Sequence, residues 1–299
     1  MNKIIIVCGP TGSGKSSLSI NLAKKLKTEI ISADSLAVYK NLDIGTAKPT
    51  KEEMKMVKHH LIDVVSPFEN FSVGDYKDLA SPIIKELLEN GKIPIICGGT
   101  GFYINSLIYD MGYGNAQKNL EVREKFLKLA EEKGVDYVFS ELEKVDKESS
   151  LKIHKNDVKR VVRALEIFYS TGQKKSEQKD SLNPIYNYVA VMINHDRDVL
   201  YDRINRRVDE MFDSGLVDEV KSLMDMGITI DNQCMQGIGY KEVYDAIISN
   251  NFENLKDIIK LNSRHYAKRQ ITFFKKLPNL HYLDSSINLE EFVLNELEK

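Results

Sequence analysis

Short runs of apolar residues alternate along much of the chain with stretches in which apolar residues return every three or four positions. Runs of the first kind predict buried strands, and stretches of the second kind predict helices that pack on them. After the run at 4–8, for example, Leu18, Leu22 and Leu26 mark one face of a helix. The expected strands cover 4–8, 29–33, 61–65, 93–97, 188–193 and 281–283, and the expected helices after the first include 51–59, 74–90, 198–212, a helix ending at 226, one ending at 249, and 254–276. Strands that alternate with helices favour an α/β fold with a parallel sheet flanked by helices.

The pattern changes in the middle of the chain. From 120 to 171 only helical periodicity is present, with Gly134 and Gly172 as helix stops and Asp157 as a helix cap. A glycine-containing segment at 112–115 predicts a hinge, and 173–183 is polar and charged. We therefore expect an all-helical domain at 112–184, inserted into an α/β core made of 1–111 and 185–299.

Composition limits the classes of function. The 299 residues carry a net charge of −2, so no basic field of the whole protein indicates nucleic acid, and an anion site must come from local clustering. Three cysteines at unrelated spacings predict neither a disulfide nor a metal site, and the adjacent His59 and His60 point apart on the expected helix. Without a signal peptide or a membrane-length apolar run, we expect a cytoplasmic protein.

The strongest motif follows the first expected strand. Its residues fit the phosphate-loop pattern G-x-x-x-x-G-K-[ST] and are Gly9, Pro10, Thr11, Gly12, Ser13, Gly14, Lys15 and Ser16. Glycines let backbone N–H groups turn toward phosphate oxygens, the helix N-terminus adds positive charge, Lys15 adds a full charge, and the Ser16 hydroxyl can bind Mg²⁺. The alternative is a glycine-rich turn that matches by chance. With the sheet, this nucleotide-binding motif predicts a fold like that of P-loop NTPases and a ligand with two or three phosphates.

The usual acidic partner of this loop is missing. Nucleotide hydrolysis and phosphoryl transfer need a second acid at the end of a distant strand, but the strand at 93–97 runs into Gly98-Gly99-Thr100-Gly101. The nearest substitute is Asp34, at the end of the strand at 29–33, where ligands of a parallel sheet collect. Asp34 can hold Mg²⁺ through water or accept a proton from a nucleophile. The alternative is a turn or helix-cap residue.

An ordered series of motifs resembles the tRNA isopentenyltransferase (dimethylallyltransferase) family over nearly the whole chain. The series comprises the phosphate loop, Asp34-Ser35-Leu36-Ala37-Val38-Tyr39, Leu42 to Pro49, His59 to Asp63, Ser72 to Tyr76, Gly98 to Tyr103, Ile153 to Asp157, Arg160 to Glu166, Gly237 to Glu242 and Tyr266 to Gln270. Members often have Thr-Trp-Phe where this chain has Thr272-Phe273-Phe274, which keeps an aromatic residue. The chain also lacks the zinc-finger tail of eukaryotic relatives, so the resemblance is to the bacterial type.

The resemblance implies a reaction and a set of roles. A dimethylallyl group would pass from dimethylallyl diphosphate to N6 of the adenosine 3′ of the anticodon in tRNA, releasing diphosphate. The phosphate loop and Mg²⁺, bound by Ser16 and Asp34, would stabilise the leaving group, with Lys15 as a catalytic cation. Asp34 would be the general base, and Thr100 would hold the adenine or the base. Arg203 and Arg207, four apart on one helix, can bind diphosphate oxygens, or else form a solvated helix face.

The helical insertion is expected to bind the anticodon stem-loop, with the adenine turned out of its stack. The residues that the resemblance assigns to tRNA are Asp34, Ser35, Leu36, Ala37, Thr100, Arg123, Lys159, Arg160, Val161, Val162, Arg163, Gln236, Gly237, Ile238, Gly239, Tyr240 and Lys241. Basic residues cluster in this insertion: Lys152, Lys155, Lys159, Arg160, Arg163, Lys174, Lys175 and Lys179. Such a cluster is usually a solvated face, and that alternative stays open. We expect a monomer. Rival readings are a small-molecule or nucleoside monophosphate kinase and a non-catalytic RNA-binding protein.

Overall fold

The computed structural model describes residues 3–109, 119–178 and 183–299. The chain forms two compact units, a larger one of Met1–Ile108 with Pro184–Lys299 and a smaller one of Tyr109–Asn183. The hinge expected at 112–115 lies outside the described residues. The helical unit is thus inserted in the sequence of the larger unit, between a helix and a strand.

A six-stranded parallel sheet organises the larger unit, with the strand order β3-β2-β4-β1-β5-β6. Its strands are β1 (Lys3–Cys8), β2 (Ile30–Ser32), β3 (His59–His60), β4 (Ile95–Gly98), β5 (Asn187–Asn194) and β6 (Leu280–Asp284). Strand β1 is central, because Ile5 is paired with Ile95 of β4 on one side and with Val189 of β5 on the other. All six strands end at the same edge of the sheet, which is where ligands of such folds bind.

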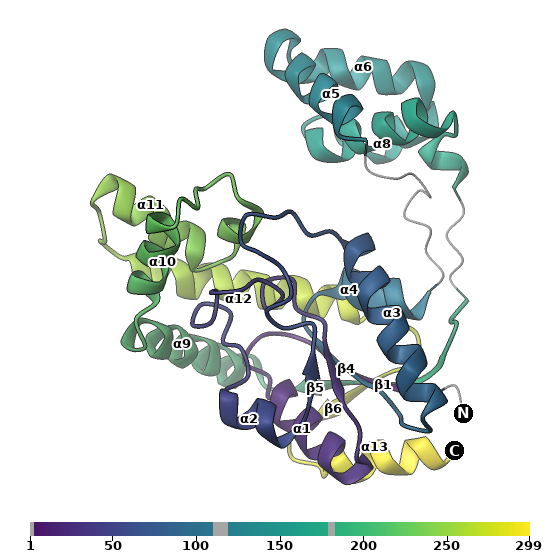
Figure 1. Ribbon diagram of the computed structural model, residues 1–299, viewed down its shortest axis with the longest axis vertical. Helices are drawn as coiled ribbons and strands as arrows, with labels where there is room; N and C mark the ends of the chain where they lie inside the picture. Colours follow the sequence, from purple (N-terminus) through teal and green to yellow (C-terminus); the bar gives the residue numbers. More distant parts are fainter. Residues whose placement is uncertain (1–2, 110–118, 179–182) are drawn as a thin grey trace. The chain divides into compact units, whose positions relative to one another are not determined.

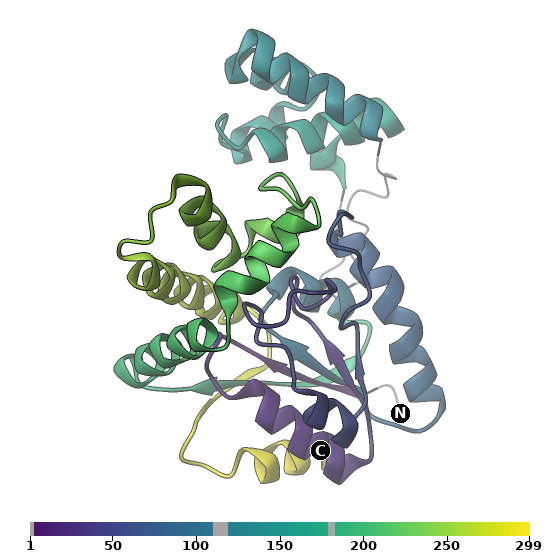
Figure 2. The ribbon, with the colours of Figure 1, turned by 60° about the vertical axis from the view of Figure 1, so that its left-hand side comes forward.

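Helices cover both faces of this sheet (Figures 1 and 2). Helix α1 (Lys15–Leu26) packs on β1, β2 and β4, and α13 (Leu289–Glu298) lies beside it on β5. Ile5 and Val7 of β1 share a buried cluster with Leu18, Leu22 and Val293 from these two helices. The other helices of the larger unit are α2 (Lys51–Met56), α3 (Val73–Glu89), α4 (Gly101–Ile108), α9 (Arg197–Asp213), α10 (Leu216–Asp225), α11 (Tyr240–Ser249) and α12 (Leu255–Phe274), with a short 3₁₀ turn at Gln233–Gln236.

The smaller unit is helical throughout its described part, as the sequence predicted. It contains α5 (Leu120–Lys133), α6 (Val135–Val145), α7 (Lys147–Lys152) and α8 (Val158–Thr171), followed by a 3₁₀ turn at Lys175–Glu177. Phe126, Val138, Leu142 and Leu165 form part of its own buried core. A separate core explains why this segment forms a compact unit by itself.

The structure corrects three expectations from the sequence. The helix predicted at 51–59 ends at Met56, and His59 instead begins edge strand β3. The strand predicted at 61–65 is absent from this described segment, because Leu61 and Asp63 have φ values of 62° and 57°, which no strand residue adopts. Helices α7 and α13 had not been predicted.

Glu29 explains the positions of the two adjacent histidines. Its carboxylate accepts hydrogen bonds from His60 Nε2 at 2.7 Å and from Lys92 Nζ at 2.7 Å, which ties β2 to β3 and to the start of β4. His59 Nδ1 instead lies 2.8 Å from the Val57 carbonyl oxygen, so the two rings do not share a ligand. None of the helices in the described parts of the chain has the length and apolar content required to cross a membrane.

Candidate active site

The phosphate loop connects the central strand β1 to helix α1. Gly12 and Gly14 have φ values of 77° and 92°, a region that other residues adopt only with strain. Gly14 is the N-cap of α1 and supplies no capping side chain, so the first N–H groups of the helix remain available to an anion. Lys15 Nζ donates to the Pro10 carbonyl oxygen at 2.6 Å, which places its ammonium group across the loop.

Residues from distant parts of the larger unit hold this loop from outside. Arg203 of α9 donates from Nε to the Gly12 carbonyl oxygen at 2.6 Å, and Nε2 of His195 lies 2.9 Å from the Ser13 carbonyl oxygen. Gln270 of α12 accepts a hydrogen bond from Thr11 N at 3.1 Å. Arg203 was expected to bind diphosphate together with Arg207, but its side chain bonds to the loop backbone, and of the pair only Arg207 lines the cavity described next.

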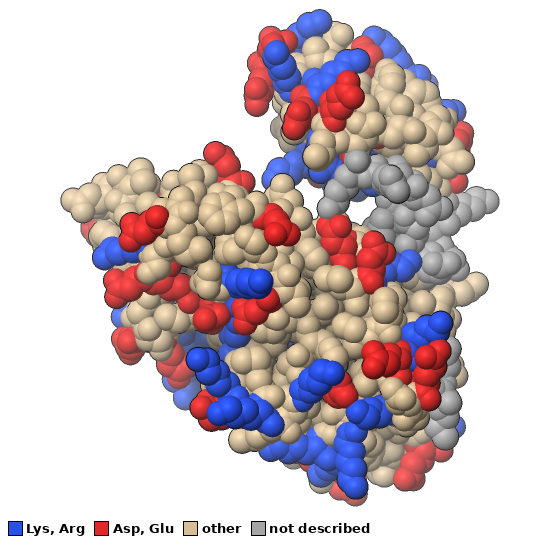
Figure 3. Space-filling view, viewed as in Figure 1, with Lys and Arg blue, Asp and Glu red and all other residues tan. Residues whose placement is uncertain are grey.

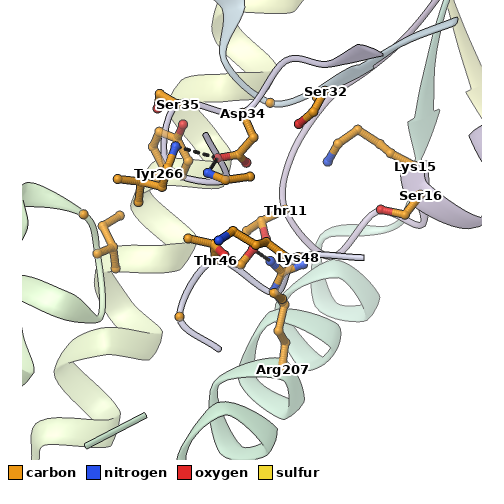
Figure 4. Close-up of a pocket in the computed structure, with 18 of the residues that line it drawn as sticks. Thr11, Lys15, Ser16, Ser32, Asp34, Ser35, Thr46, Lys48, Arg207 and Tyr266 are labelled. Atoms are coloured by element: carbon orange, nitrogen blue, oxygen red, sulfur yellow. Dashed lines mark hydrogen bonds between the residues drawn. The ribbon is translucent and has the colours of Figure 1, made fainter. Parts of the chain in front are cut away.

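A cavity of about 480 Å³ opens beside the phosphate loop (Figure 4). Its walls come from the carboxyl edge of the sheet, the segment 45–49, the segment 233–238 and helices α9 and α12. Residues with polar or charged side chains in these walls include Thr11, Lys15, Ser16, Ser32, Asp34, Ser35, Thr46, Lys48, Arg207, Gln236, Tyr266 and Arg269. Leu36, Ala37, Ile62, Ile204 and Ile238 give it apolar surface. The cavity therefore offers charged groups for phosphate and apolar surface for a hydrocarbon.

Asp34 lies at the end of β2, and the glycine-rich turn after β4 lies between it and the phosphate loop. Its Oδ1 accepts hydrogen bonds from Leu36 N at 2.9 Å and Ala37 N at 3.2 Å. These contacts form the turn that the alternative interpretation expected, and they also fix a carboxylate in the cavity wall. A turn residue and a proton acceptor are therefore compatible roles for this side chain.

Thr100 holds the residue next to Asp34. Its hydroxyl oxygen accepts from Ser35 N at 3.0 Å, and its own N–H donates to the Ala33 carbonyl oxygen at 3.0 Å. Tyr266 lies beside Asp34 in the cavity (Figure 4). Burial, and then the negative charge of Asp34, raise the pKa of Tyr266 to about 12, so its phenol is neutral at physiological pH.

Two of the cations that line the cavity, Lys15 and Arg207, make it suited to an anion. Burial lowers the pKa of Lys15, and it also lowers the pKa of Arg207, where the Asp34 charge acts in the opposite direction. A bound anion would compensate the desolvation of both cations. On the face drawn in Figure 3, by contrast, Lys and Arg side chains are interspersed with Asp and Glu, in keeping with the net charge of −2.

The segment assigned to tRNA in the larger unit separates into lining and supporting residues. Gln236, Gly237 and Ile238 line the cavity. Tyr240, the first residue of α11, is fully buried instead, and its hydroxyl donates to Glu219 Oε1 at 2.6 Å. Gly239 precedes it as the N-cap of that helix, and Lys241 is exposed.

The residues assigned to tRNA in the helical unit also differ in exposure. Lys159 and Arg160 are exposed on α8, whereas Val161 and Val162 are buried in the core of the unit. Arg123 and Arg163 both pair with Glu166, each at 2.8 Å, and the Glu166 side chain has no exposed surface. Arg123 therefore connects α5 to α8 through this buried carboxylate, whereas Arg163 pairs with it within α8.

The donor groups for a metal ion are oxygens. Ser16 is exposed at the start of α1, and both its side chain and that of Asp34 line the cavity. Hydroxyl and carboxylate oxygens are ligands that Mg²⁺ accepts, together with phosphate oxygens of a substrate. Among the described residues no group of three His, Cys, Asp or Glu side chains is arranged to hold a metal. The donor set thus fits an ion that is bound mainly through the substrate.

Several cavity residues had been given no role from the sequence. Thr46, Lys48, Tyr266 and Gln270 belong to motifs that carried the family resemblance, but no local pattern indicated their contacts. Lys48 has only 5% of its side chain exposed, and its Nζ contacts Asp43, Asp63 and the Tyr39 carbonyl oxygen. Membership in a motif was the one available signal for these residues.

A parallel α/β sheet with a phosphate loop, a carboxylate and a partly apolar cavity at its carboxyl edge defines a P-loop protein that can bind a phosphorylated ligand. The model of the family described as IPP transferase matches residues 37–277. Among curated proteins, the chain is 44% identical to the tRNA dimethylallyltransferase of Acetivibrio thermocellus over 99% of this chain and 95% of that protein. It is 46% identical to that of Thermoanaerobacter pseudethanolicus over 98% and 96%.

Solved structures agree with these relatives. The full-length tRNA isopentenylpyrophosphate transferase of Bacillus halodurans is 42% identical, with a TM-score of 0.73 over 100% of this chain and 95% of that one. A eukaryotic dimethylallyltransferase acting on tRNA is 30% identical, with a TM-score of 0.83 over 100% and 78%. The chain belongs to the IPP transferase family.

Proposed function

We propose that this chain transfers a dimethylallyl group from dimethylallyl diphosphate to N6 of the adenosine 3′ of the anticodon in tRNA. The observation that carries the proposal is the juxtaposition, in one cavity, of a phosphate loop with Lys15 and Arg207 and of a fixed carboxylate, Asp34. The relatives named above are tRNA dimethylallyltransferases, and this cavity has both the charged and the apolar surface that an allylic diphosphate needs.

The proposed chemistry is a displacement at carbon. The bond between C1 of the allyl group and the diphosphate oxygen breaks, its electron pair leaves with diphosphate, and the N6 lone pair of adenine forms the new bond to C1. The N6 proton passes to the Asp34 carboxylate, whose orientation is fixed by Leu36 N and Ala37 N. Backbone N–H groups of the phosphate loop, Lys15 and Arg207 stabilise the charge that develops on diphosphate.

Mg²⁺ fits the oxygen donors of this site. Ser16 would bind it directly, and Asp34 would contribute through water. When bound with the diphosphate, the ion supplies positive charge to the leaving group. Arg203 supports the same end of the substrate by holding the Gly12 carbonyl oxygen.

The RNA is proposed to contact both units. Exposed Lys159 and Arg160 of α8 supply positive charge for phosphates, and Gln236 to Ile238 line the cavity into which the adenine is turned. Thr100 acts by holding the turn that carries Asp34, and Arg123 acts by fixing α5 against α8 through Glu166, with which Arg163 pairs within α8. We retain the prediction of a monomer as part of the proposal.

A mass measurement tests the proposal. The protein is incubated with Mg²⁺, dimethylallyl diphosphate and an adenosine-containing anticodon stem-loop RNA, and the RNA is then weighed by mass spectrometry. We expect it to gain one dimethylallyl group in place of one hydrogen. A parallel incubation with ATP and nucleoside monophosphates tests the kinase alternative, and transfer of phosphate there with unmodified RNA in the first arm would overturn the proposal.

A further inference from the structure

One carboxylate outside the cavity collects four hydrogen bonds. Glu219 of α10 accepts from Asp43 N and Ile44 N at 2.8 Å each through Oε2, and from Gly45 N at 3.2 Å through Oε1. The hydroxyl of Tyr240 donates to the same Oε1 at 2.6 Å. Glu219 does not line the cavity, and no step of the reaction proposed above uses it.

The three backbone donors belong to a compact turn at 43–48. Within it, Ala47 N bonds to the Ile44 carbonyl oxygen and Lys48 N to that of Asp43, and the Thr46 hydroxyl bonds to the Leu42 carbonyl oxygen. Consecutive N–H groups that point the same way form a concave site for an anion, and here the anion is the Glu219 carboxylate. Removing that carboxylate leaves three backbone donors without their partner.

Tyr240 closes this arrangement tightly. A Cβ atom on Gly45 would lie 2.5 Å from the Tyr240 ring, so only glycine fits where the ring meets the turn. Burial first, and the Glu219 charge second, raise the pKa of Tyr240 far above its ordinary value. Its hydroxyl therefore stays protonated and donates to Glu219 throughout the physiological pH range.

The turn contacts a cavity side chain through Thr46, the residue after Gly45. The Thr46 carbonyl oxygen accepts a hydrogen bond from a terminal nitrogen of Arg207 at 2.9 Å, and both residues line the cavity (Figure 4). The orientation of the Arg207 guanidinium thus depends on where the turn holds that oxygen. A chain of contacts runs from Tyr240 through Glu219 and the turn to the diphosphate end of the site.

We infer that Glu219, together with the Tyr240 hydroxyl, is a positioning residue that sets the orientation of Arg207 toward diphosphate. The role of Arg207 in this inference rests on the proposed function. The new elements are Glu219 and the chain of contacts by which it acts on Arg207. Because Tyr240 directly follows Gln236 to Gly239, the same contacts tie that part of the cavity wall to the diphosphate end.

A double-mutant cycle tests the route. The probe is inorganic diphosphate with Mg²⁺, and its affinity is measured by calorimetry for the wild type, Glu219→Gln, Arg207→Ala and the double variant. We expect Glu219→Gln to weaken binding on the order of tenfold, as loss of alignment of one charged hydrogen bond would do. In the Arg207→Ala background the same change should have almost no further effect, because Glu219 acts through that side chain.

Two further variants separate positioning from stability. Glu29→Gln breaks a partly exposed network at the amino end of β2, opposite the end that carries Asp34, and should lower stability without changing diphosphate affinity. Tyr240→Phe removes a single hydrogen bond, so it can take the place of Glu219→Gln in the cycle if that variant does not fold. It should weaken diphosphate binding less than Glu219→Gln does, and again only when Arg207 is present.

The outcomes are distinct. Equal losses in the wild-type and Arg207→Ala backgrounds, or unchanged affinity in a folded Glu219→Gln or Tyr240→Phe variant, would overturn the inference while leaving the proposed function intact. A wild-type protein that binds no diphosphate and prenylates no RNA would instead contradict the proposed function itself. Steady-state kinetics give a second readout, in which KM for dimethylallyl diphosphate should rise more than kcat falls.

Discussion

The backbone N–H of Thr11 donates to the side-chain carbonyl of Gln270 at 3.1 Å, so a residue of α12 holds the phosphate loop from 259 positions away. The other end of the same amide donates from Nε2 to the Gly99 carbonyl oxygen at 3.0 Å. One buried amide therefore spaces the two glycine-rich turns that border the cavity. Its two ends are not interchangeable, because one contact needs an acceptor and the other a donor.

Replacing Gln270 by Met should loosen both turns. The substitution keeps the length of the side chain but leaves Thr11 N and the Gly99 carbonyl oxygen without this partner. We expect the free energy of unfolding to fall by about 2–4 kcal/mol, as for two buried groups that lose a hydrogen bond, and kcat/KM to fall with it. Denaturant titration and initial rates measure the two effects. Gln173→Met, at an exposed position in the helical unit, is the matched control and should change neither.

Asp34→Asn tests the proposed base. Asparagine can keep the hydrogen bonds from Leu36 N and Ala37 N but cannot take up a proton at neutral pH. The transfer rate should fall on the order of 10² to 10⁴-fold, while the affinity for tRNA stays within about twofold. Single-turnover kinetics and a binding titration report the two quantities. Asp78→Asn, which removes an exposed carboxylate on α3, should leave both unchanged, and full turnover of Asp34→Asn would exclude Asp34 as the base.

The Ser16 hydroxyl is the proposed direct protein ligand of Mg²⁺. Chelation of divalent ions should abolish transfer, and Ser16→Ala should raise the Mg²⁺ concentration needed for half-maximal rate on the order of tenfold. Rates over a magnesium titration give this value. Ser17→Ala is the control, since Ser17 is exposed on the same turn but does not line the cavity. Equal magnesium requirements for the two variants would argue against Ser16 as a ligand.

Salt dependence tests the proposed RNA surface. If Lys159 contacts a phosphate, Lys159→Ala should weaken tRNA binding at low salt and reduce the slope of log affinity against log salt by about one. Filter binding at several ionic strengths gives the slope. Lys55→Ala removes an exposed charge from α2 in the larger unit and should leave the slope unchanged. A wild-type affinity that does not vary with salt would contradict the whole electrostatic assignment.

Glu29 should make the free energy of unfolding depend on pH in the acidic range. Burial acts to raise its pKa, but hydrogen bonds from Lys92, His60 and Lys58 outweigh burial and lower the pKa from 4.5 to about 2. A carboxyl group whose pKa is lowered by folding stabilises the folded state at every pH above the pKa it has in the unfolded chain. This contribution is lost as the pH falls from 4.5 toward 2. The free energy of unfolding of the wild type should therefore exceed that of Glu29→Gln by about 2–3 kcal/mol at pH 7 and by much less near pH 2.5. A constant difference across that range would refute the linkage.

Local periodicity predicted most of the larger unit's sheet because its buried strands read as continuous apolar runs. It failed at 61–65, where the same composition belongs to an irregular segment. There, Val64 and Val65 bond to the Val38 carbonyl oxygen, and the positive φ values of Leu61 and Asp63 prevent a strand. Strand β3 was missed because it has only two residues at the edge of the sheet.

The site residues also separate into those that a local sequence pattern indicates and those that it does not. The phosphate loop and Asp34 were predicted, since a local motif and the end of a strand place them. Glu219 and Gln270 were not, because each acts through hydrogen bonds to backbone groups more than a hundred positions away, and no short pattern encodes such partners. The role of Arg203 also needed the structure, because helical spacing relates it to Arg207 but does not show which oxygen each guanidinium meets.

The hydrogen bond between Ile185 N and the Ile108 carbonyl oxygen, at 2.9 Å, draws together the two points where the helical unit joins the larger one. A few residues of turn would suffice to close the chain there without disturbing a strand. The helical unit is thus inserted between two residues that the larger unit already brings together, so the insertion adds a compact unit without interrupting the sheet.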